Sequence, residues 1–228
     1  MMVPALLLCL FLSLHRQATA DGGHVRCRSI DCPKYTVVEV DDVRNFEVRE
    51  YESPLWVFVK HHQQATSYQQ ALSAQAPILS DYMKGNNDFN TTISETAPAV
   101  TVVIPGLYHA NDVGAPFGDA YRFARYLPQN VQLTAPPTSN NTVRFWRFPP
   151  ENQRVVVKKF REGAINDATI AHAVASLRNS LKGSTWESRV RPCGGFAVAD
   201  YNYPDTNGTT KNEIMLLAEK EWLSGGGQ

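Results

Sequence analysis

Phe46-Glu-Val-Arg-Glu-Tyr51, followed after a short Ser-Pro turn by Leu55-Trp-Val-Phe-Val59, is the stretch that decides the fold. Runs of β-branched and aromatic residues on both sides of a turn predict two consecutive strands. The pattern recurs later, where a Pro-Pro turn separates Val143-Arg-Phe-Trp-Arg-Phe148 from Val155-Val-Val-Lys-Lys-Phe160. Each pair precedes a helical stretch and a further strand. Two copies of strand, turn, strand, helix and strand predict one unit with pseudo-two-fold symmetry and a cleft between its halves.

Two helices are predicted from the spacing of apolar residues, one over about 65–83 and one over about 168–181. Pro77 falls inside the first helix and predicts a kink or restart there. Asp167 is expected to cap the second helix, and Gly183 is expected to end it. The apolar faces consist of Tyr68, Leu72, Ala76, Leu79 and Met83 in the first helix, and of Ile170, Val174, Leu177 and Leu181 in the second.

The remaining strands complete the predicted fold class. They are expected at residues 36–40, 95–104, 121–126, 196–201 and 212–217. In the repeat, 95–104 is matched with 212–217, which gives Glu95 and Glu213 related positions, either as a polar pair in the cleft or in structural hydrogen bonds. The sequence therefore predicts an α+β fold, a distorted antiparallel β-barrel of two pseudo-symmetric halves flanked by two α-helices.

Composition excludes some functions and sets the domain count. The chain has 228 residues, enough for one domain with a real core. Lys and Arg together number 22, as do Asp and Glu, so the charge gives no support for nucleic-acid binding. After the N-terminus, no apolar run is long enough to predict a membrane span.

The N-terminus predicts secretion. The apolar run from Met1 to Leu14 is short for a membrane span, and Ala18-Thr-Ala20 after it suits a signal peptidase. We therefore expect a signal peptide over 1–20, with an uncleaved anchor or a buried helix as the alternatives. An N-terminal arm over 21–33, a folded domain over 34–223 and a flexible tail over 224–228 would follow.

Three Asn-x-Ser/Thr triplets in polar, turn-rich stretches agree with secretion. They make Asn90, Asn140 and Asn207 candidates for N-glycosylation.

Cysteine usage suggests an oxidising compartment but leaves the pairing open. Cys9 would leave with the signal peptide, so Cys27, Cys32 and Cys193 remain, and one disulfide with one spare thiol is expected. A Cys27–Cys32 bond would close a small local loop. A bond from either residue to Cys193 would tie the N-terminal arm to the second half and remove more chain entropy.

No residue set predicts catalysis. His61 and His62 follow a predicted strand and are weak candidates for an iron ligand, although adjacent residues of an extended chain point to opposite faces. His172 lies off the apolar stripe of its helix and is expected at the surface. Four aromatic residues are interpreted as core rather than as a ligand platform, namely Trp56, Phe58, Trp146 and Phe148.

An ordered set of short motifs resembles a known family. The motifs are Asp31-Cys-Pro-Lys-Tyr35, Asn45-Phe-Glu-Val-Arg-Glu-Tyr51, Trp56, Tyr82-Met-Lys-Gly-Asn-Asn87, Thr96-Ala-Pro98, Pro116-Phe117, Ala199-Asp-Tyr-Asn-Tyr-Pro204 and Lys211-Asn-Glu-Ile214. Over about residues 31–220 the chain resembles the SOUL/heme-binding protein (HEBP) family, closest to a secreted version of the heme-binding protein 2 branch. The resemblance implies a barrel of two related halves. It also implies heme or porphyrin binding in an apolar surface cleft beside the first helix, which here would involve Leu72, Ala76, Leu79 and Met83.

The chain departs from the family where heme contacts are implied. Glu50 stands where one branch has a proposed axial histidine, and a carboxylate is a poorer ligand of heme iron than imidazole. Ser73, Ser80 and Thr206 stand where another branch has residues implicated in heme contact, so basic partners for the propionates are missing. A glycan on Asn207 would crowd the same cleft.

The sequence thus predicts a secreted heme- or tetrapyrrole-binding protein, a carrier or scavenger rather than an enzyme, that binds mainly by apolar burial. The alternative is an extracellular protein-interaction module, with an unidentified protein partner, that kept the fold and lost heme affinity. The missing histidine and basic residues favour this alternative.

Overall fold

The computed structural model describes Cys27 and residues 30–59, 67–104, 120–138, 143–147, 154–160, 165–190, 195–204 and 210–218. All the predicted helices and strands are present, and their ends differ from the predicted ones by a few residues. The elements are β1 (Tyr35–Asp41), β2 (Phe46–Tyr51), β3 (Leu55–Val59), α1 (Tyr68–Met83), β4 (Ala99–Ile104), β5 (Ala120–Tyr126), η1 (Gln129–Val131), β6 (Val143–Arg147), β7 (Arg154–Phe160), α2 (Asp167–Leu181), η2 (Glu187–Arg189), β8 (Phe196–Pro204) and β9 (Thr210–Ala218).

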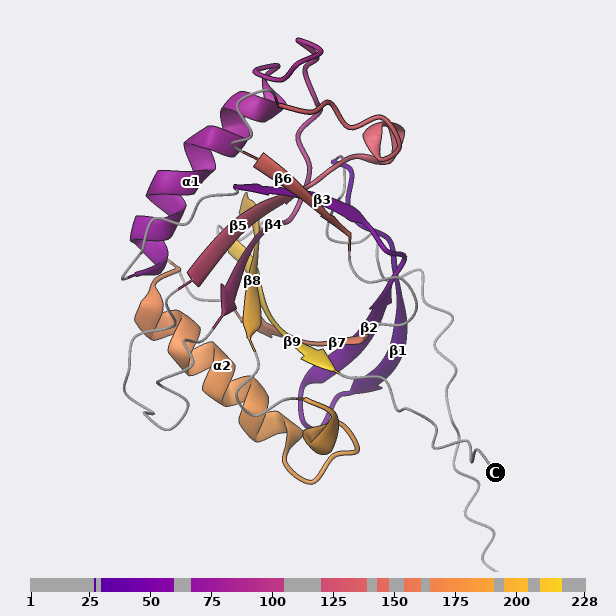
Figure 1. Cartoon of the computed structure of the whole chain (residues 1–228). Coiled ribbons are helices and arrows are strands. Elements are labelled where there is room, and N and C mark those ends of the chain that lie inside the picture. The colour runs from indigo at the N-terminus through magenta and orange to yellow at the C-terminus, as the bar shows by residue number, and fades with distance from the viewer. Residues whose placement is uncertain are drawn as a thin grey trace, which may run out of the picture.

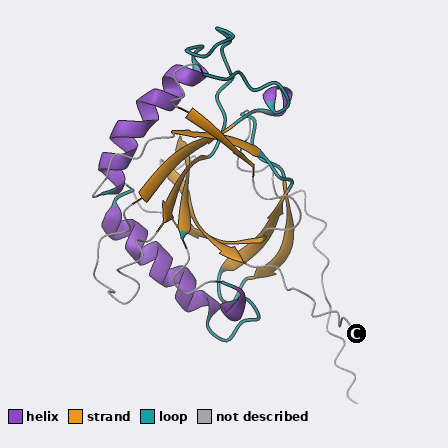
Figure 2. Ribbon diagram, in the orientation of Figure 1, coloured by secondary structure: helices purple, strands orange, loops and turns teal. Residues whose placement is uncertain are grey.

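The strands form one antiparallel sheet in the order β1-β2-β7-β9-β8-β4-β5-β3-β6. The sheet curls into an open, distorted barrel, and both helices lie against its outer face (Figures 1 and 2). The predicted α+β fold class is therefore confirmed.

The strand order is symmetric about the central β4–β8 pair. Exchanging β2 with β6, β3 with β7, β4 with β8 and β5 with β9 reverses the order from β2 to β6, and β1 is an extra strand at one edge. The sheet thus has the two-fold arrangement predicted from the repeat. The predicted match of 95–104 with 212–217 is wrong, because the counterpart of β4 in the sheet is β8.

The first residues of four pairs of equivalent elements show which positions correspond. They pair Phe46 with Val143, Leu55 with Arg154, Tyr68 with Asp167, and Ala99 with Phe196. Counting along β2 and β6 makes Arg49 equivalent to Trp146. Counting along β4 and β8 makes Val102 equivalent to Ala199, and their ladder partners are Arg122 on β5 and Glu213 on β9. Arg122 and Glu213 therefore occupy equivalent positions in the two halves.

The hydrophobic core between the helices and the sheet comes largely from the predicted apolar faces, but Leu72, Ala76 and Val174 are only partly buried. Helix α1 packs on β3 and β5, and α2 packs on the equivalent strands β7 and β9. Helix α1 continues through Pro77, whose side chain is exposed. Gly183, at φ 70°, follows the end of α2 as predicted. The buried helix residues are Tyr68, Ala71, Gln75, Leu79, Tyr82 and Met83 of α1, and Ile170, Ala173, Leu177 and Leu181 of α2.

The N-termini of the two helices meet, and Asp167 joins them. The expected cap role of Asp167 is wrong, because the side chain of Asn166 accepts the backbone N–H of Thr169 and caps α2. Asp167 instead accepts the backbone N–H of Tyr68, the first residue of α1, at 2.9 Å. One carboxylate therefore lies in the first turn of α2 and at the N-terminus of α1, where negative charge is favourable.

Candidate ligand-binding site

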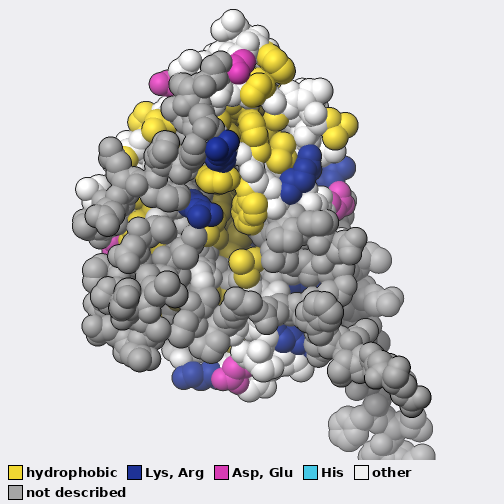
Figure 3. Space-filling model, in the orientation of Figure 1, with side chains coloured by type: hydrophobic (Ala, Val, Ile, Leu, Met, Phe, Trp, Pro, Cys, Tyr) yellow, Lys and Arg dark blue, Asp and Glu magenta, His cyan; other side chains and the backbone are white. Residues whose placement is uncertain are grey.

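The inner, concave face of the sheet carries a cavity of about 300 Å³. Side chains alternate between the faces of each strand, so every second residue points inward, such as Val100 and Val102 on β4. Figure 3 shows hydrophobic side chains lining a furrow near the centre of this view, with Lys or Arg side chains beside it. The lining residues are Tyr51, Trp56, Pro98, Val100, Val102, Arg122, Ala124, Trp146, Val155, Gly195, Phe196, Ala197, Met215 and Leu217.

Small residues on the central strands leave room for this cavity. Gly195 precedes β8, Ala197 lies on β8, and Ala124 lies on β5. Trp56 and Trp146 are ladder partners on β3 and β6 and form an aromatic wall. The volume is at the lower end of the roughly 300–1,000 Å³ typical of small-molecule sites. The cavity therefore suits a compact apolar molecule.

Among the described residues that line the cavity, Arg122 is the one that carries a charge. It is exposed, and its guanidinium carbon lies 5.7 Å from the centre of the Phe58 ring. No carboxylate within the described residues forms an ion pair with it.

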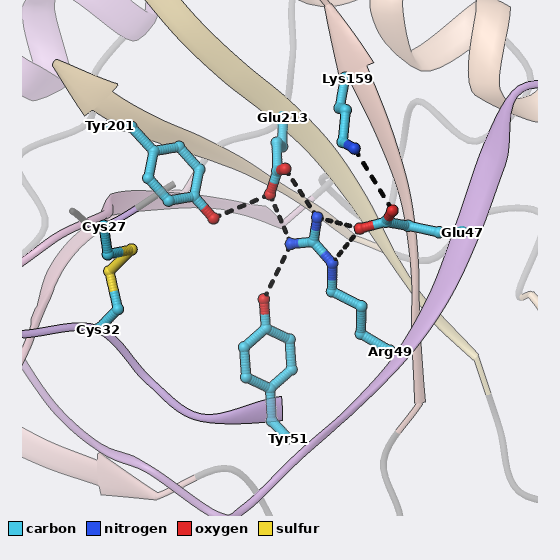
Figure 4. Close-up of polar contacts among 8 residues, drawn as sticks. All are labelled: Cys27, Cys32, Glu47, Arg49, Tyr51, Lys159, Tyr201 and Glu213. Atoms are coloured by element: carbon cyan, nitrogen blue, oxygen red, sulfur yellow. Dashed lines mark hydrogen bonds and ion pairs between the residues drawn. A yellow bond between two sulfur atoms is a disulfide. The ribbon is translucent and has the colours of Figure 1, made fainter. Parts of the chain in front are cut away.

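The other end of the concave face is filled by a buried ion pair (Figure 4). Arg49 on β2 donates two hydrogen bonds to Glu213 on β9, at 2.7 and 2.8 Å, and both side chains are 0% exposed. Glu47 pairs with the same guanidinium and with Lys159, the latter at 3.5 Å. Burial disfavours the charged form of Arg49, but Glu213 together with Tyr51 and Tyr201 outweighs this effect, so the pKa of Arg49 lies well above its usual value.

Tyrosines surround the ion pair. Tyr201 donates a hydrogen bond to Glu213 at 3.0 Å, and Arg49 donates one to the Tyr51 hydroxyl at 3.4 Å. The Arg49 guanidinium also lies 4.4 Å from the centre of the Tyr35 ring. Burial raises the pKa of Tyr201 well above its usual value, and the nearby Glu213 carboxylate adds to the shift. Burial likewise raises the pKa of Tyr35 to about 12. The three tyrosines therefore surround the ion pair and keep it away from water.

The helix α1 positions suggested by the resemblance span the border between core and surface. Leu79 and Met83 are buried between helix and sheet. Leu72, Ala76 and Ser80 are partly buried, and Ser73 is exposed.

A model of the SOUL heme-binding protein family matches residues 30–217. The chain belongs to this family. No curated protein matches the chain. Among solved structures, it is similar to the "Putative bacterial transcription regulation protein from Staphylococcus aureus MU50", with 12% sequence identity and a TM-score of 0.40. That match covers 77% of this chain and 99% of the other, and the similarity is too low to carry an argument.

Several predicted positions of this SOUL family member lie outside the described residues. They are His61, His62, Asn140, Cys193, Thr206, Asn207, Phe148, the signal peptide over 1–20 and the tail over 224–228. Asn90 is described and is exposed in a turn after α1. His172 is exposed on α2, as predicted.

The structure selects one of the disulfide alternatives. Cys27 and Cys32 are bonded, with Cα atoms 6.1 Å apart. The loop that they close is pinned to the sheet, because Asp31 accepts backbone N–H groups of Ala97 at 3.1 Å and of Gln129 at 2.9 Å. The bond therefore lies beside the filled end of the concave face (Figure 4).

Two predictions about polar and aromatic residues can be compared with the structure. Of the two alternatives for Glu95 and Glu213, the polar pair is wrong and structural hydrogen bonding is observed, since Glu95 bonds to Arg125 on the outer face while Glu213 is buried inside. The assignment of Trp56 and Trp146 to the core alone is incomplete. Trp56 is buried and Trp146 is partly buried, yet both also line the cavity.

The sequence interpretation missed Arg122 and the cavity around it. A signal was present, because Tyr121-Arg-Phe-Ala-Arg-Tyr126 alternates and places Arg122 and Ala124 on one face. The alternation does not say that this face is the concave one. Only the pairing of β5 with β4 and β3 shows this.

Within the described ranges, no group of three or more His, Cys, Asp or Glu residues could hold a metal ion. No helix in the same ranges is long and apolar enough to cross a membrane.

Proposed function

We propose that this SOUL family member is a secreted carrier or scavenger of heme or another tetrapyrrole, and that it is not an enzyme. The family match over residues 30–217 is the observation that carries the proposal. Within the family, we place it in the heme-binding protein 2-like branch.

We place the tetrapyrrole beside α1, on the border that runs from Leu72 through Ala76 to Ser80. The residues at this border are partly buried, so a flat apolar ligand would cover the exposed remainder. Each square ångström of apolar surface removed from water contributes about 25 cal/mol before ordering costs. The macrocycle offers a large apolar face, so burial alone gives useful affinity.

Iron ligation is not required in this proposal. Glu50 lies on β2 with its carboxylate paired to Arg154 at 3.2 Å, so it is already engaged. Ser73 and Ser80 offer no positive charge to the propionates. We therefore expect the affinity for a tetrapyrrole to depend on the macrocycle more than on its metal or its propionate groups.

The first experiment compares hemin with iron-free protoporphyrin by absorbance titration of the mature protein. Both should bind, with dissociation constants within about threefold of each other, since apolar burial is common to both. The double variant His61→Ala/His62→Ala should change neither dissociation constant. Strict dependence on iron, together with loss of the Soret shift in that variant, would contradict binding by apolar burial.

The second experiment locates the site with a symmetry-matched pair of variants. Ala76→Glu places a charge on the α1 border, and Ala175→Glu places it at the equivalent position of α2. The first should weaken protoporphyrin binding by roughly tenfold or more, because a charge opposes apolar burial, and the second should leave it unchanged. Equal effects of the two variants on protoporphyrin binding would contradict a site beside α1. A charge at Leu79 is a poor test because that side chain is 0% exposed and the chain would lose its core.

Secretion is tested on protein expressed in a secretory host. The mature chain should begin at Asp21, and an N-glycosidase should lower its mass through at least one of Asn90, Asn140 and Asn207. If the secreted protein binds neither porphyrin at micromolar concentration, the interaction-module alternative is the better description.

A further inference from the structure

We propose that the concave cavity is a second binding site, separate from the α1 border, for a small apolar molecule that carries one anionic group. The apolar body would occupy the cavity between Trp146, Val100 and Ala197, and the anion would pair with Arg122. This inference does not depend on tetrapyrrole binding.

The two-fold arrangement of the sheet supplies the main argument. In one half, Arg49 and Glu213 neutralise each other on the concave face. At the equivalent positions of the other half stand Trp146 and Arg122. The Arg122 cation thus stands in the place of the Glu213 carboxylate, and Trp146, part of the aromatic wall, stands in the place of Arg49. Arg122 therefore carries a positive charge, and no residue of the described sheet supplies its counter-ion.

The surroundings of Arg122 define the ligand. Arg122 is exposed at the cavity lining, as is Leu217, so this is where the cavity meets solvent. The Phe58 ring lies beside the guanidinium and helps to orient it. The remaining lining residues are apolar or aromatic, so they favour the body of a ligand and not a second charge. A carboxylate or sulfonate at the mouth would form a charge-assisted hydrogen bond with the guanidinium.

The cavity size excludes a large ligand. About 300 Å³ accommodates up to about three aromatic rings or a branched chain, but not a complete tetrapyrrole macrocycle. The ligand class is therefore a small aromatic or aliphatic acid.

The test uses two fluorescent probes that share an aromatic body and differ in charge. Anilinonaphthalene sulfonate carries one anion, and N-phenylnaphthylamine carries none. The mature protein should bind one equivalent of each, and the sulfonate should bind more tightly. Arg122→Gln should weaken the sulfonate roughly five- to tenfold, the loss of one partly solvated charged hydrogen bond. It should change the neutral probe by less than about twofold.

Further variants separate the cavity from the rest of the surface. Ala197→Phe fills the cavity and should weaken both probes by roughly tenfold or more. Leu217→Trp obstructs the mouth from an exposed position and should act in the same direction without repacking the core. Lys182→Gln removes an exposed cation at the end of α2 and should have no effect. Thermal unfolding of each variant shows that the comparison is made on folded protein.

Three results would overturn the proposal. The first is absence of saturable binding of either probe. The second is sulfonate binding that is equally tight in wild type, Arg122→Gln and Leu217→Trp. The third is an equal loss in Arg122→Gln and Lys182→Gln, which would show non-specific attraction to positive charge.

Discussion

The two ends of the concave face occupy equivalent places in the sheet, yet one is filled and the other is hollow. At the filled end, Arg49, Glu213 and Tyr201 are buried and hydrogen-bond to one another through Glu213. At the hollow end, Arg122 and Trp146 lie beside a cavity of about 300 Å³. The difference teaches that a repeated strand pattern duplicates positions without duplicating roles. One copy is filled by a buried ion pair, and the other leaves a cavity.

The largest expected effect comes from breaking the filled end. Among the described residues, Glu213→Gln leaves the buried Arg49 charge with only Glu47 as an anionic partner, and an uncompensated buried charge costs about 3–5 kcal/mol. We expect a loss of about 3 kcal/mol in the free energy of unfolding, measured by urea denaturation.

The matched control removes both charges. Arg49→Met combined with Glu213→Leu should recover at least half of that loss, because apolar replacement of a buried ion pair is often neutral. A loss below about 1 kcal/mol in Glu213→Gln would mean that the ion pair does not hold this end of the barrel.

The second prediction concerns alkaline pH. Folding raises the pKa of buried tyrosines, to about 12 for Tyr35 and Tyr68 and well above the usual value for Tyr201. The unfolded chain loses these protons near pH 10, whereas the folded chain keeps them. The contribution of these tyrosines to the free energy of unfolding is therefore complete below about pH 10 and is lost as the pH rises from 10 towards 12.

The measurement is urea denaturation at a series of pH values above 9. Each such tyrosine contributes a slope of about 1.36 kcal/mol per pH unit in this window. Tyr201→Phe should remove one such contribution and flatten the curve, in addition to the loss of its hydrogen bond to Glu213. An unchanged slope in Tyr201→Phe would show that this phenol already ionises in the folded protein.

The third prediction extends the comparison to the helices. Tyr68 and Asp167 are the equivalent first residues of α1 and α2, but only Asp167 has a carboxylate, and it accepts the backbone N–H of the other helix. Asp167→Ala should cost about 0.5–2 kcal/mol, the usual range for a lost cap. Asp167→Asn keeps an acceptor oxygen and should cost about half as much. Equal costs in urea denaturation would mean that charge, and not the hydrogen bond, is what matters here.

The fold was predictable from the sequence because its signals are local. Alternation in residues 46–51 and 143–148 and the apolar stripes of the helices depend on neighbours a few residues apart. The match of the repeat failed at residues 95–104 because the strand at 212–217 resembles them in composition, while pairing across the sheet decides the true counterpart. Pairing is a long-range property that local patterns do not contain.

The sites were predictable only in part for the same reason. The helix face around Leu72 and Ala76 follows from periodicity, but the use of that face for a ligand came from the family resemblance. Arg122 was visible as a charge in a strand, but its place on the concave face depends on strands distant in sequence. The partner of Glu213 could not be foreseen either, since Arg49 is 164 residues away.

The smallest expected effect is the sharpest test of the comparison. Arg122→Gln changes the position equivalent to Glu213, yet its free energy of unfolding should stay within about 0.5 kcal/mol of wild type, as for other exposed substitutions. The reason is that Arg122 contacts the Phe58 ring but forms no ion pair within the described chain, so its removal leaves no described charge without a partner.

Urea denaturation without ligand and with saturating anilinonaphthalene sulfonate separates a role of Arg122 in stability from a role in ligand binding. The ligand should stabilise wild type more than Arg122→Gln at equal concentration, because a weaker complex shifts the folding equilibrium less. A loss of more than about 1.5 kcal/mol without ligand would make Arg122 a structural residue like Glu213, and the two halves would then share one role.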